Sequence, residues 1–173
     1  DDVEIEDVER LQRVLHQPKL AQEKPVLAPE YPWDKHGTCV RAVIYDAELG
    51  RFRMWYHSMP AFYGWKGDHR IRNGTSYAVS EDGIHWEKPK LGLVEFNGSK
   101  ANNIVISSDM ADRHHVNIGG PAVFMDRNPI TPPDARYKTF LISRSPLGMR
   151  PFKSSDGIHW SPLSDGPVIT HGA

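Results

Sequence analysis

The chain has 173 residues, of which 39% are hydrophobic and 25% are charged, as is typical of a globular protein with a core of its own. Its 21 basic residues nearly balance its 22 acidic ones, and no run of like charge suggests nucleic acid or a membrane surface as a partner. No apolar stretch is long enough to span a bilayer, and the single cysteine, Cys39, excludes an internal disulfide and a multi-cysteine zinc site. One cysteine fits a cytoplasmic protein and an exported bacterial protein equally well.

Residues 1–36 are predicted to form a short N-terminal helix and an extended lead-in. Asp7 can cap the helix, Pro18 ends it, and its apolar face consists of Val8, Leu11 and Leu15. Prolines interrupt the stretch 18–32, so we expect it to be extended. After this stretch, turn signals recur about every ten residues, which favours many short strands over long helices.

A seven-residue motif then occurs twice. The segment 80–86 (SEDGIHW) returns as 154–160 (SSDGIHW), with six of seven residues identical at an offset of 74. An Asp-Gly pair between two β-rich runs predicts a hairpin, because glycine adopts positive φ at little cost. The preceding segments 51–56 and 136–141 also match in pattern. Each copy therefore reads as strand, turn, strand, loop, strand, Asp-Gly turn, strand.

Four antiparallel strands in a repeat of this length describe a β-propeller blade, so the predicted fold class is all-β. The first blade is placed at 37–93 and the second at 116–169, within a region, 37–173, that also holds the start of a third. Two blades cannot close a ring, and each needs neighbours to bury its faces. We therefore expect the remaining blades to come from the rest of a longer parent chain or from another chain.

The repeated hairpin resembles the one in family 43 and family 32 type glycoside hydrolases and their uncharacterised bacterial relatives, which are five-bladed propellers. The segment 29–34 (PEYPWD), followed by 50–56 (GRFRMWY), is similar to their opening blade, and 136–138 (RYK) to their second. The resemblance implies cleavage of glycosidic bonds by carboxylates at the mouth of the central channel. The chain lacks the Asp-Pro-Asn-Gly and Arg-Asp-Pro motifs of the well-known members, and Asp34 is the nearest match to their first aspartate.

Blade topology places candidate site residues before the first inner strand, which begins on the ligand face. Asp34 lies there, and the resemblance implies that it acts as general base or nucleophile. Trp33 could stack on a sugar ring, and His36 could share the same face. In the alternative interpretation Asp34 caps a turn, Trp33 belongs to the core and His36 is an ordinary surface histidine.

Two further segments are expected on the ligand side. The lead-in to the second blade carries His115 and Asn117, which could hydrogen-bond to sugar hydroxyls. The loop 60–73 carries Tyr63 and Trp65, whose ring faces suit carbohydrate. The alternative is that both segments are solvated loops without a site. No P-loop, dinucleotide fingerprint or zinc-helix motif is present, so neither a cofactor nor a metal is predicted.

Other acidic and aromatic side chains are expected to be structural. The turn at the end of each inner strand carries an aspartate on the opposite face, namely Asp46 and Asp126. The hairpins repeat an aspartate, a histidine and a tryptophan together, which indicates scaffold: Asp82, His85 and Trp86, then Asp156, His159 and Trp160.

The sequence supports two main hypotheses of function. The first is a glycoside hydrolase of an unidentified oligo- or polysaccharide, with Asp34 as one carboxylate and the general acid beyond residue 173. The second is a non-catalytic propeller that binds carbohydrate. A scaffold propeller that binds no sugar is a third. The carboxylates at the starts of the inner strands of the remaining blades would discriminate the first two.

Overall fold

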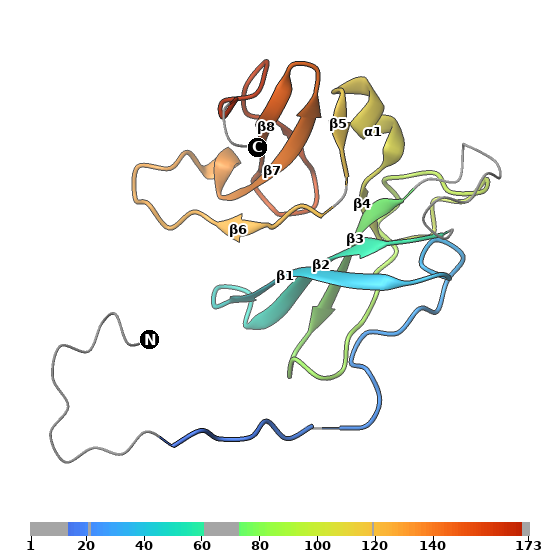
Figure 1. Ribbon diagram of the computed structural model, residues 1–173. Helices are drawn as coiled ribbons and strands as arrows, with labels where there is room; N and C mark the ends of the chain where they lie inside the picture. The colour runs from blue at the N-terminus through green and yellow to red at the C-terminus, as the bar shows by residue number, and fades with distance from the viewer. Residues whose placement is uncertain (1–13, 21, 61–72, 119, 171–173) are drawn as a thin grey trace, which may run out of the picture.

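The computed structural model describes residues 14–20, 22–60, 73–118 and 120–170. The predicted start of the N-terminal helix lies outside these residues. Its predicted end does not form, because residues 14–20 adopt no helix. Leu15, the one residue of the predicted apolar face that the structure describes, is 82% exposed and has nothing to pack against, and an isolated helix this short is marginal in water. The segment runs away from the rest of the chain (Figure 1).

The first sheet is a four-stranded antiparallel meander. Its strands follow chain order and are β1 (Thr38–Asp46), β2 (Arg51–Ser58), β3 (Gly74–Ser80) and β4 (Ile104–Ile106). The strand expected directly after the Asp82-Gly83 turn is reduced to an isolated bridge between Val79 and Glu87. Pro89 follows, and proline cannot donate to a ladder, so the fourth strand forms only at β4, beyond the boundary predicted at residue 93.

The second sheet repeats this arrangement with its first strand split in two. It contains β5 (Val116–Asn117), β6 (Phe124–Met125), β7 (Tyr137–Arg144), β8 (Leu147–Ser154) and β9 (Ser161–Pro162). Both β5 and β6 pair with β7, so together they occupy the position that β1 has in the first sheet. A short helix, α1 (Ser108–Arg113), leads into β5, and a 3-10 turn, η1 (Pro133–Ala135), precedes β7 (Figure 1). The prediction of an all-β chain of antiparallel sheets is confirmed.

One apolar core joins the two sheets. Trp55 and Tyr77 of the first sheet pack in the same buried cluster as Tyr137, Leu141 and Phe152 of the second. A smaller cluster on the other face of the first sheet contains Leu27, Met54, Tyr56 and Ala78, with Trp86 against it. The first sheet is therefore covered on both faces.

The repeated hairpins form the same network of hydrogen bonds. In the first, the backbone N–H groups of Ile84 and His85 donate to Asp82, and the backbone N–H of Gly83 donates to Ser80 Oγ. In the second hairpin, the backbone N–H groups of Ile158 and His159 donate to Asp156, and that of Gly157 donates to Ser154 Oγ, at nearly the same distances. Although burial opposes it, the His159 backbone and ring lower the pKa of Asp156 to about 2. The hairpin aspartates are structural, as expected.

The second hairpin docks onto the first sheet. Trp55 Nε1 donates to the Gly157 carbonyl oxygen at 2.7 Å, and Arg53 donates to the Asp156 carbonyl oxygen. Arg53 Nη1 also donates to Asp46 at 3.3 Å and to the hydroxyl of Tyr137 at 2.5 Å. The buried guanidinium of Arg53 in the first sheet thus binds both the hairpin and strand β7 of the second sheet.

Candidate functional site

A cleft of about 640 Å³ lies between the two sheets, at the end where β1 begins and β2 ends. Side chains from both sheets and from α1 contribute to it. Its polar lining consists of Arg41, His57, Asn73, Ser108, Asp112, Asn117 and Arg144, and its apolar lining of Met59, Ala111, Val116, Ile118 and Ile142. The sequence predicts a ligand at this end of the sheets.

Two backbone irregularities shape the cleft around Arg41. The β1–β2 register shifts between Val40 and Ala42, so Arg41 is the extra residue of a β-bulge, a feature that re-aims a side chain. Opposite it, β5 ends at Asn117 and β6 begins at Phe124, and Gly120, which lies between these two strands, adopts a φ of 136°. A Cβ on Gly120 would lie 2.6 Å from Nε and Cζ of Arg41. The glycine therefore leaves the space that the guanidinium occupies.

His57 lies on the same wall, near the end of β2 and opposite Cys39 and Thr75 in the ladder. The residue is 8% exposed, and its buried Nε2 has no hydrogen-bond partner among the described residues. Burial lowers the pKa of His57, and the positive charge of Arg41 lowers it further, so the ring is neutral at pH 7. A buried imidazole nitrogen without a partner costs about 1–3 kcal/mol, which indicates a place where a ligand or water completes the bonding.

The opposite wall is fixed by Arg144 at the end of β7. Its Nη2 donates to the carbonyl oxygen of Ala111 at 3.1 Å and to Asp112 at 2.8 Å. At the start of α1, the Ser107 hydroxyl accepts from the backbone N–H of Met110 at 3.2 Å. The helix α1 is thereby capped at its start and hydrogen-bonded to β7 along its last turn. These bonds fix the position of this wall of the cleft.

The structure brings one of the predicted binding residues into the cleft. Asn117, on β5, is exposed and lines it. His115 is exposed two residues earlier with a φ of 54°, and its carbonyl oxygen accepts from the Arg144 backbone N–H at 2.8 Å, but it is not part of the lining. His36 is half-buried and outside the lining, although its backbone N–H donates to the carbonyl oxygen of Met59 at 3.0 Å. Tyr63 and Trp65 lie outside the described residues.

Asp34 is fully buried, with 0% exposure, and is not in the cleft. One carboxylate oxygen accepts from the backbone N–H groups of Glu30 and Tyr31 at 2.9 and 2.8 Å. The other accepts from Lys88 Nζ at 2.8 Å and from the Tyr56 hydroxyl at 3.4 Å. This is the geometry of a buried ion pair that holds the lead-in segment against the first sheet. A catalytic role for Asp34 stays a prediction.

Trp33 is half-buried and has partners within the fold. Its Nε1 donates to Asn103 Oδ1 at 2.7 Å, its ring stacks on Tyr31 with centroids 4.7 Å apart, and Phe96 meets it edge-on at 6.2 Å. In this position it packs the lead-in segment onto the first sheet, and the residues that line the cleft do not include it.

Sequence reasoning missed six of the seven polar cleft residues: Arg41, His57, Asn73, Ser108, Asp112 and Arg144. A signal was available for two of them. The topology that placed Asp34 on the ligand face also places the start of β1 and the end of β2 there, which are the positions of Arg41 and His57. The β7 residue Arg144 had no such signal, because it depends on how the two sheets pack together.

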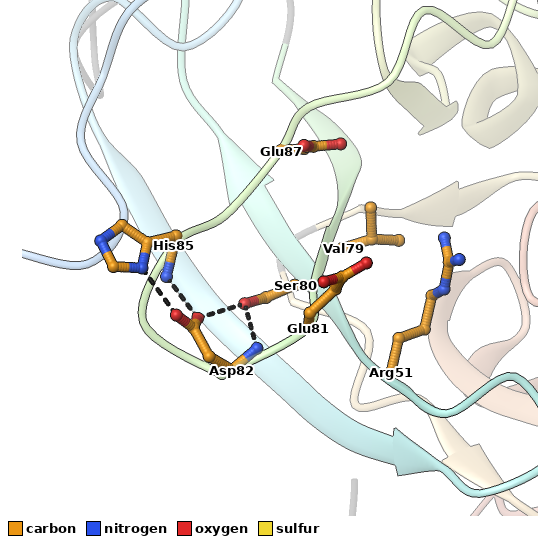
Figure 2. Close-up of a pocket in the computed structure, with 7 residues that line it drawn as sticks. All are labelled: Arg51, Val79, Ser80, Glu81, Asp82, His85 and Glu87. Carbon is orange, nitrogen blue, oxygen red and sulfur yellow. Dashed lines mark hydrogen bonds and ion pairs between the residues drawn. The ribbon is translucent and has the colours of Figure 1, made fainter.

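A smaller hollow of about 190 Å³ lies beside the first hairpin (Figure 2). Asp82 and His85 face each other in it, with Asp82 Oδ2 2.6 Å from His85 Nδ1. That contact, with the backbone hydrogen bonds, holds the pKa of Asp82 well below its usual range. Because the second hairpin repeats the same contact at 2.7 Å, we assign this hollow to the scaffold.

Within the described part of the chain, no group of three or more His, Cys, Asp or Glu side chains could hold a metal ion. None of the helices formed by the described residues is long and apolar enough to cross a membrane.

No family model matches the chain. Two curated relatives, the uncharacterized proteins MT1551 and Rv1502 from two strains of Mycobacterium tuberculosis, are each 36% identical to it over 78 residues. That stretch is 44% of this chain and 21% of each relative, so the chain matches about a fifth of their length. Among solved structures, an N-acetylgalactosamine deacetylase from F. plautii in complex with blood group B trisaccharide aligns with a TM-score of 0.42 and 16% identity, over 76% of this chain and 31% of that one.

Proposed function

We propose that the chain forms two neighbouring blades of a glycoside hydrolase type β-propeller, in which the cleft between the sheets binds a carbohydrate. Support for the propeller comes from the repetition itself. Two antiparallel meanders with one hairpin motif follow each other, and the second packs against a face of the first. Propellers are built by repeating this step around a ring.

The second sheet offers a surface for the next blade of the proposed ring. Strand registers make Phe140 the counterpart of Trp55, and Lys138 the counterpart of Arg53. Trp55 is fully buried by the second hairpin, whereas Phe140 is only half-buried. A third blade with the same hairpin would cover Phe140 and Lys138 as the second covers Trp55 and Arg53.

The observation that carries the carbohydrate proposal is the composition of the cleft. Sugar rings need an apolar surface for their C–H faces and several hydrogen-bond donors and acceptors for their hydroxyls. Met59, Val116 and Ile142 supply the first, and the neutral His57 and Asn117 are among the groups that supply the second. The volume of about 640 Å³ is adequate for one or two sugar rings.

Hydrolysis is the more specific form of the proposal, with Asp34 as one carboxylate and the general acid in a blade beyond residue 173. The non-catalytic alternative is favoured by one observation. Asp34 is engaged by four donors and by the charge of Lys88, so it could reach a substrate only if this buried ion pair opened.

Carbohydrate binding is tested by screening the chain on a glycan array and repeating the screen with Asn117→Ala. Asn128→Ala is the matched control, because Asn128 is an exposed asparagine outside the cleft. We expect Asn117→Ala to weaken binding about fivefold or more, the loss of one or two hydrogen bonds, and the control to bind as the parent does. The absence of any bound glycan, or equal effects of the two variants, would refute the proposal.

Hydrolysis is tested on the protein with its remaining blades, by comparing Asp34→Asn with Lys88→Met. Both variants break the buried pair and should lower the melting temperature. If Asp34 is catalytic, turnover is lost in Asp34→Asn alone, at a temperature where both variants are folded. If both variants keep turnover, Asp34 is a structural residue only.

A further inference from the structure

The repeated hairpin is covered in one copy and open in the other. In the second hairpin, residues 156–158 (Asp-Gly-Ile) are half-buried or buried, because this turn docks onto Arg53 and Trp55 of the first sheet. In the first hairpin the same three residue types occupy positions 82–84, and Ile84 is 47% exposed. The first hairpin therefore presents the docking surface of the second in an open form.

The second sheet has a matching open surface on the face that points away from the first sheet. This outer face carries Phe124, Lys138 and Phe140. Lys138 and Phe140 are the counterparts of the two residues that hold the second hairpin on the first sheet. Phe124 pairs with Lys138 as Ile44 pairs with Arg53. Ile44 packs against the core between the sheets, whereas Phe124 is 42% exposed, so the outer face repeats a hairpin-binding surface that no hairpin of the described residues covers.

The lead-in segment leaves the open hairpin accessible. Leu27 packs on the first sheet against Met54 and Tyr56, and Trp86 at the end of the hairpin motif packs against the same cluster. Ile84, beside the Asp-Gly turn, is exposed and outside this cluster. A contact with Ile84 therefore does not require the lead-in segment to move.

One difference between the two hairpins gives the contact charge complementarity. The first hairpin has Glu81 where the second has Ser155, which borders a cavity between the sheets together with Val79. The strand registers put Lys153 at the position of Val79 in the second sheet. A first hairpin seated on the outer face therefore brings Glu81 to Lys153. The ammonium of Lys153 has three N–H donors, so it can bond to Glu81 while it keeps its contact with Asp134 at 2.6 Å.

We propose that copies of this chain associate head to tail, with the first hairpin of one copy docked on the outer face of the second sheet of another. The first blade of the second copy then takes the place of the third blade, so the inference rests on the proposed propeller arrangement and names the partner of its open face. Because the two surfaces differ, the contact is heterologous, and a dimer keeps one open hairpin and one open face to which further copies add.

The contact between copies is expected to be weaker than the contact within the chain. Phe140 lacks the indole N–H with which Trp55 binds the second hairpin, so one hydrogen bond is missing. Association should therefore depend on the concentration of the chain.

The test is sedimentation velocity of the chain over a range of concentrations. Ile84→Asp changes the hairpin and Phe124→Asp changes the outer face, and Leu20→Asp, at a residue 90% exposed in the lead-in segment, is the control with the same change of charge. All three residues are exposed, so the single chain should stay folded, which circular dichroism checks. The parent and the control should form dimers and larger species as the concentration rises, and each of the other two variants should associate at least about tenfold more weakly.

Mixing the two interface variants tests the head-to-tail geometry. Ile84→Asp keeps an intact outer face and Phe124→Asp keeps an intact hairpin, so an equimolar mixture should form one intact contact and stop at a dimer. A parent that stays monomeric at every concentration, variants that associate as the parent does, or a mixture that stays monomeric overturns the inference. In each of these cases, glycan binding by the chain leaves the carbohydrate proposal intact, whereas the absence of glycan binding refutes that proposal whatever the oligomeric state.

Discussion

The two sheets carry the same ion pair at equivalent positions, yet in different surroundings. In the first sheet, Arg53 and Asp46 are 3% and 2% exposed. In the second, Lys138 and Asp126 are 20% and 23% exposed. The register of the long strands matches in the two sheets, although the connection after Asp126 is longer than the one after Asp46 and contains η1. The second hairpin covers the first ion pair, and no hairpin among the described residues covers the second.

The two sheets show which features depend on local sequence and which depend on tertiary packing. The hairpin network is complete in both copies, so it forms from the sequence of seven residues. The burial of the ion pair requires the next sheet. The pKa values of the two aspartates reflect this difference in burial. In the partly exposed pair, the contact with Lys138 is the main cause that lowers the pKa of Asp126 to about 2. For Asp46, burial opposes the lowering of the pKa that Tyr137 and Arg53 produce.

The largest expected effect comes from removing the two cations in turn. Arg53→Met leaves Asp46 buried beside Tyr137 and removes the bond to the second hairpin, so we expect a loss of about 3–5 kcal/mol in the free energy of unfolding. Lys138→Met breaks the partly exposed pair and should cost less than about 1 kcal/mol. Urea denaturation measures both. Equal losses would mean that the second hairpin does not cover the first pair.

Substitution of the two hairpin glycines is expected to give a smaller difference in stability between the two sheets. Gly83 and Gly157 have φ values of 76° and 71°, so alanine costs about 1 kcal/mol of backbone strain at either position. A Cβ at Gly157 would also lie 2.6 Å from the ring of Trp55, whereas at Gly83 it would meet Phe52 at an ordinary 3.6 Å. We expect Gly157→Ala to lower stability by about 1–3 kcal/mol more than Gly83→Ala in thermal denaturation. The opposite order would contradict the docking.

The smallest expected effect is a dependence of the free energy of unfolding on pH in the acidic range. Because the folded-state pKa of Asp156 is about 2, below its ordinary value of 3.8, the ionised carboxylate stabilises the fold above about pH 4, and this contribution is lost as the pH falls through 2. Asp156→Asn should therefore be less stable than the parent at pH 7 and nearly equal to it at pH 2. Urea midpoints across this range would show a constant difference if the carboxylate had no such role.

Much of the fold could be predicted from the sequence, because the repeated signals are local. The Asp-Gly hairpins, the antiparallel strands before them and the structural roles of Asp82 and Asp156 follow from turn chemistry and alternation. The prediction that the N-terminal helix continues through Leu15 is wrong for a tertiary reason, because Leu15 has no surface to pack against. The late position of β4 depends on Pro89, which follows the Val79–Glu87 bridge and cannot donate to a ladder.

The site was predicted less well than the fold. Topology predicts that a ligand binds at one end of the sheets, and Asn117 lies in the cleft at that end. Asp34 was chosen by resemblance to a motif, whereas its environment is set by Lys88, 54 residues further on, which no local pattern indicates. Arg41 depends on a bulge and on a glycine of the other sheet, and both are visible only once the two sheets are packed.

The most direct measurement of the central claim is the location of the bound sugar. Backbone ¹H–¹⁵N spectra of the chain, recorded during titration with a glycan that binds on the array, report it residue by residue. The account predicts that the amides of Arg41, His57 and Asn117 shift, and that those of the hairpin residues 80–86 do not. Shifts centred on the first hairpin, or no shifts with any glycan from the array, would contradict the assignment of the cleft as a carbohydrate site.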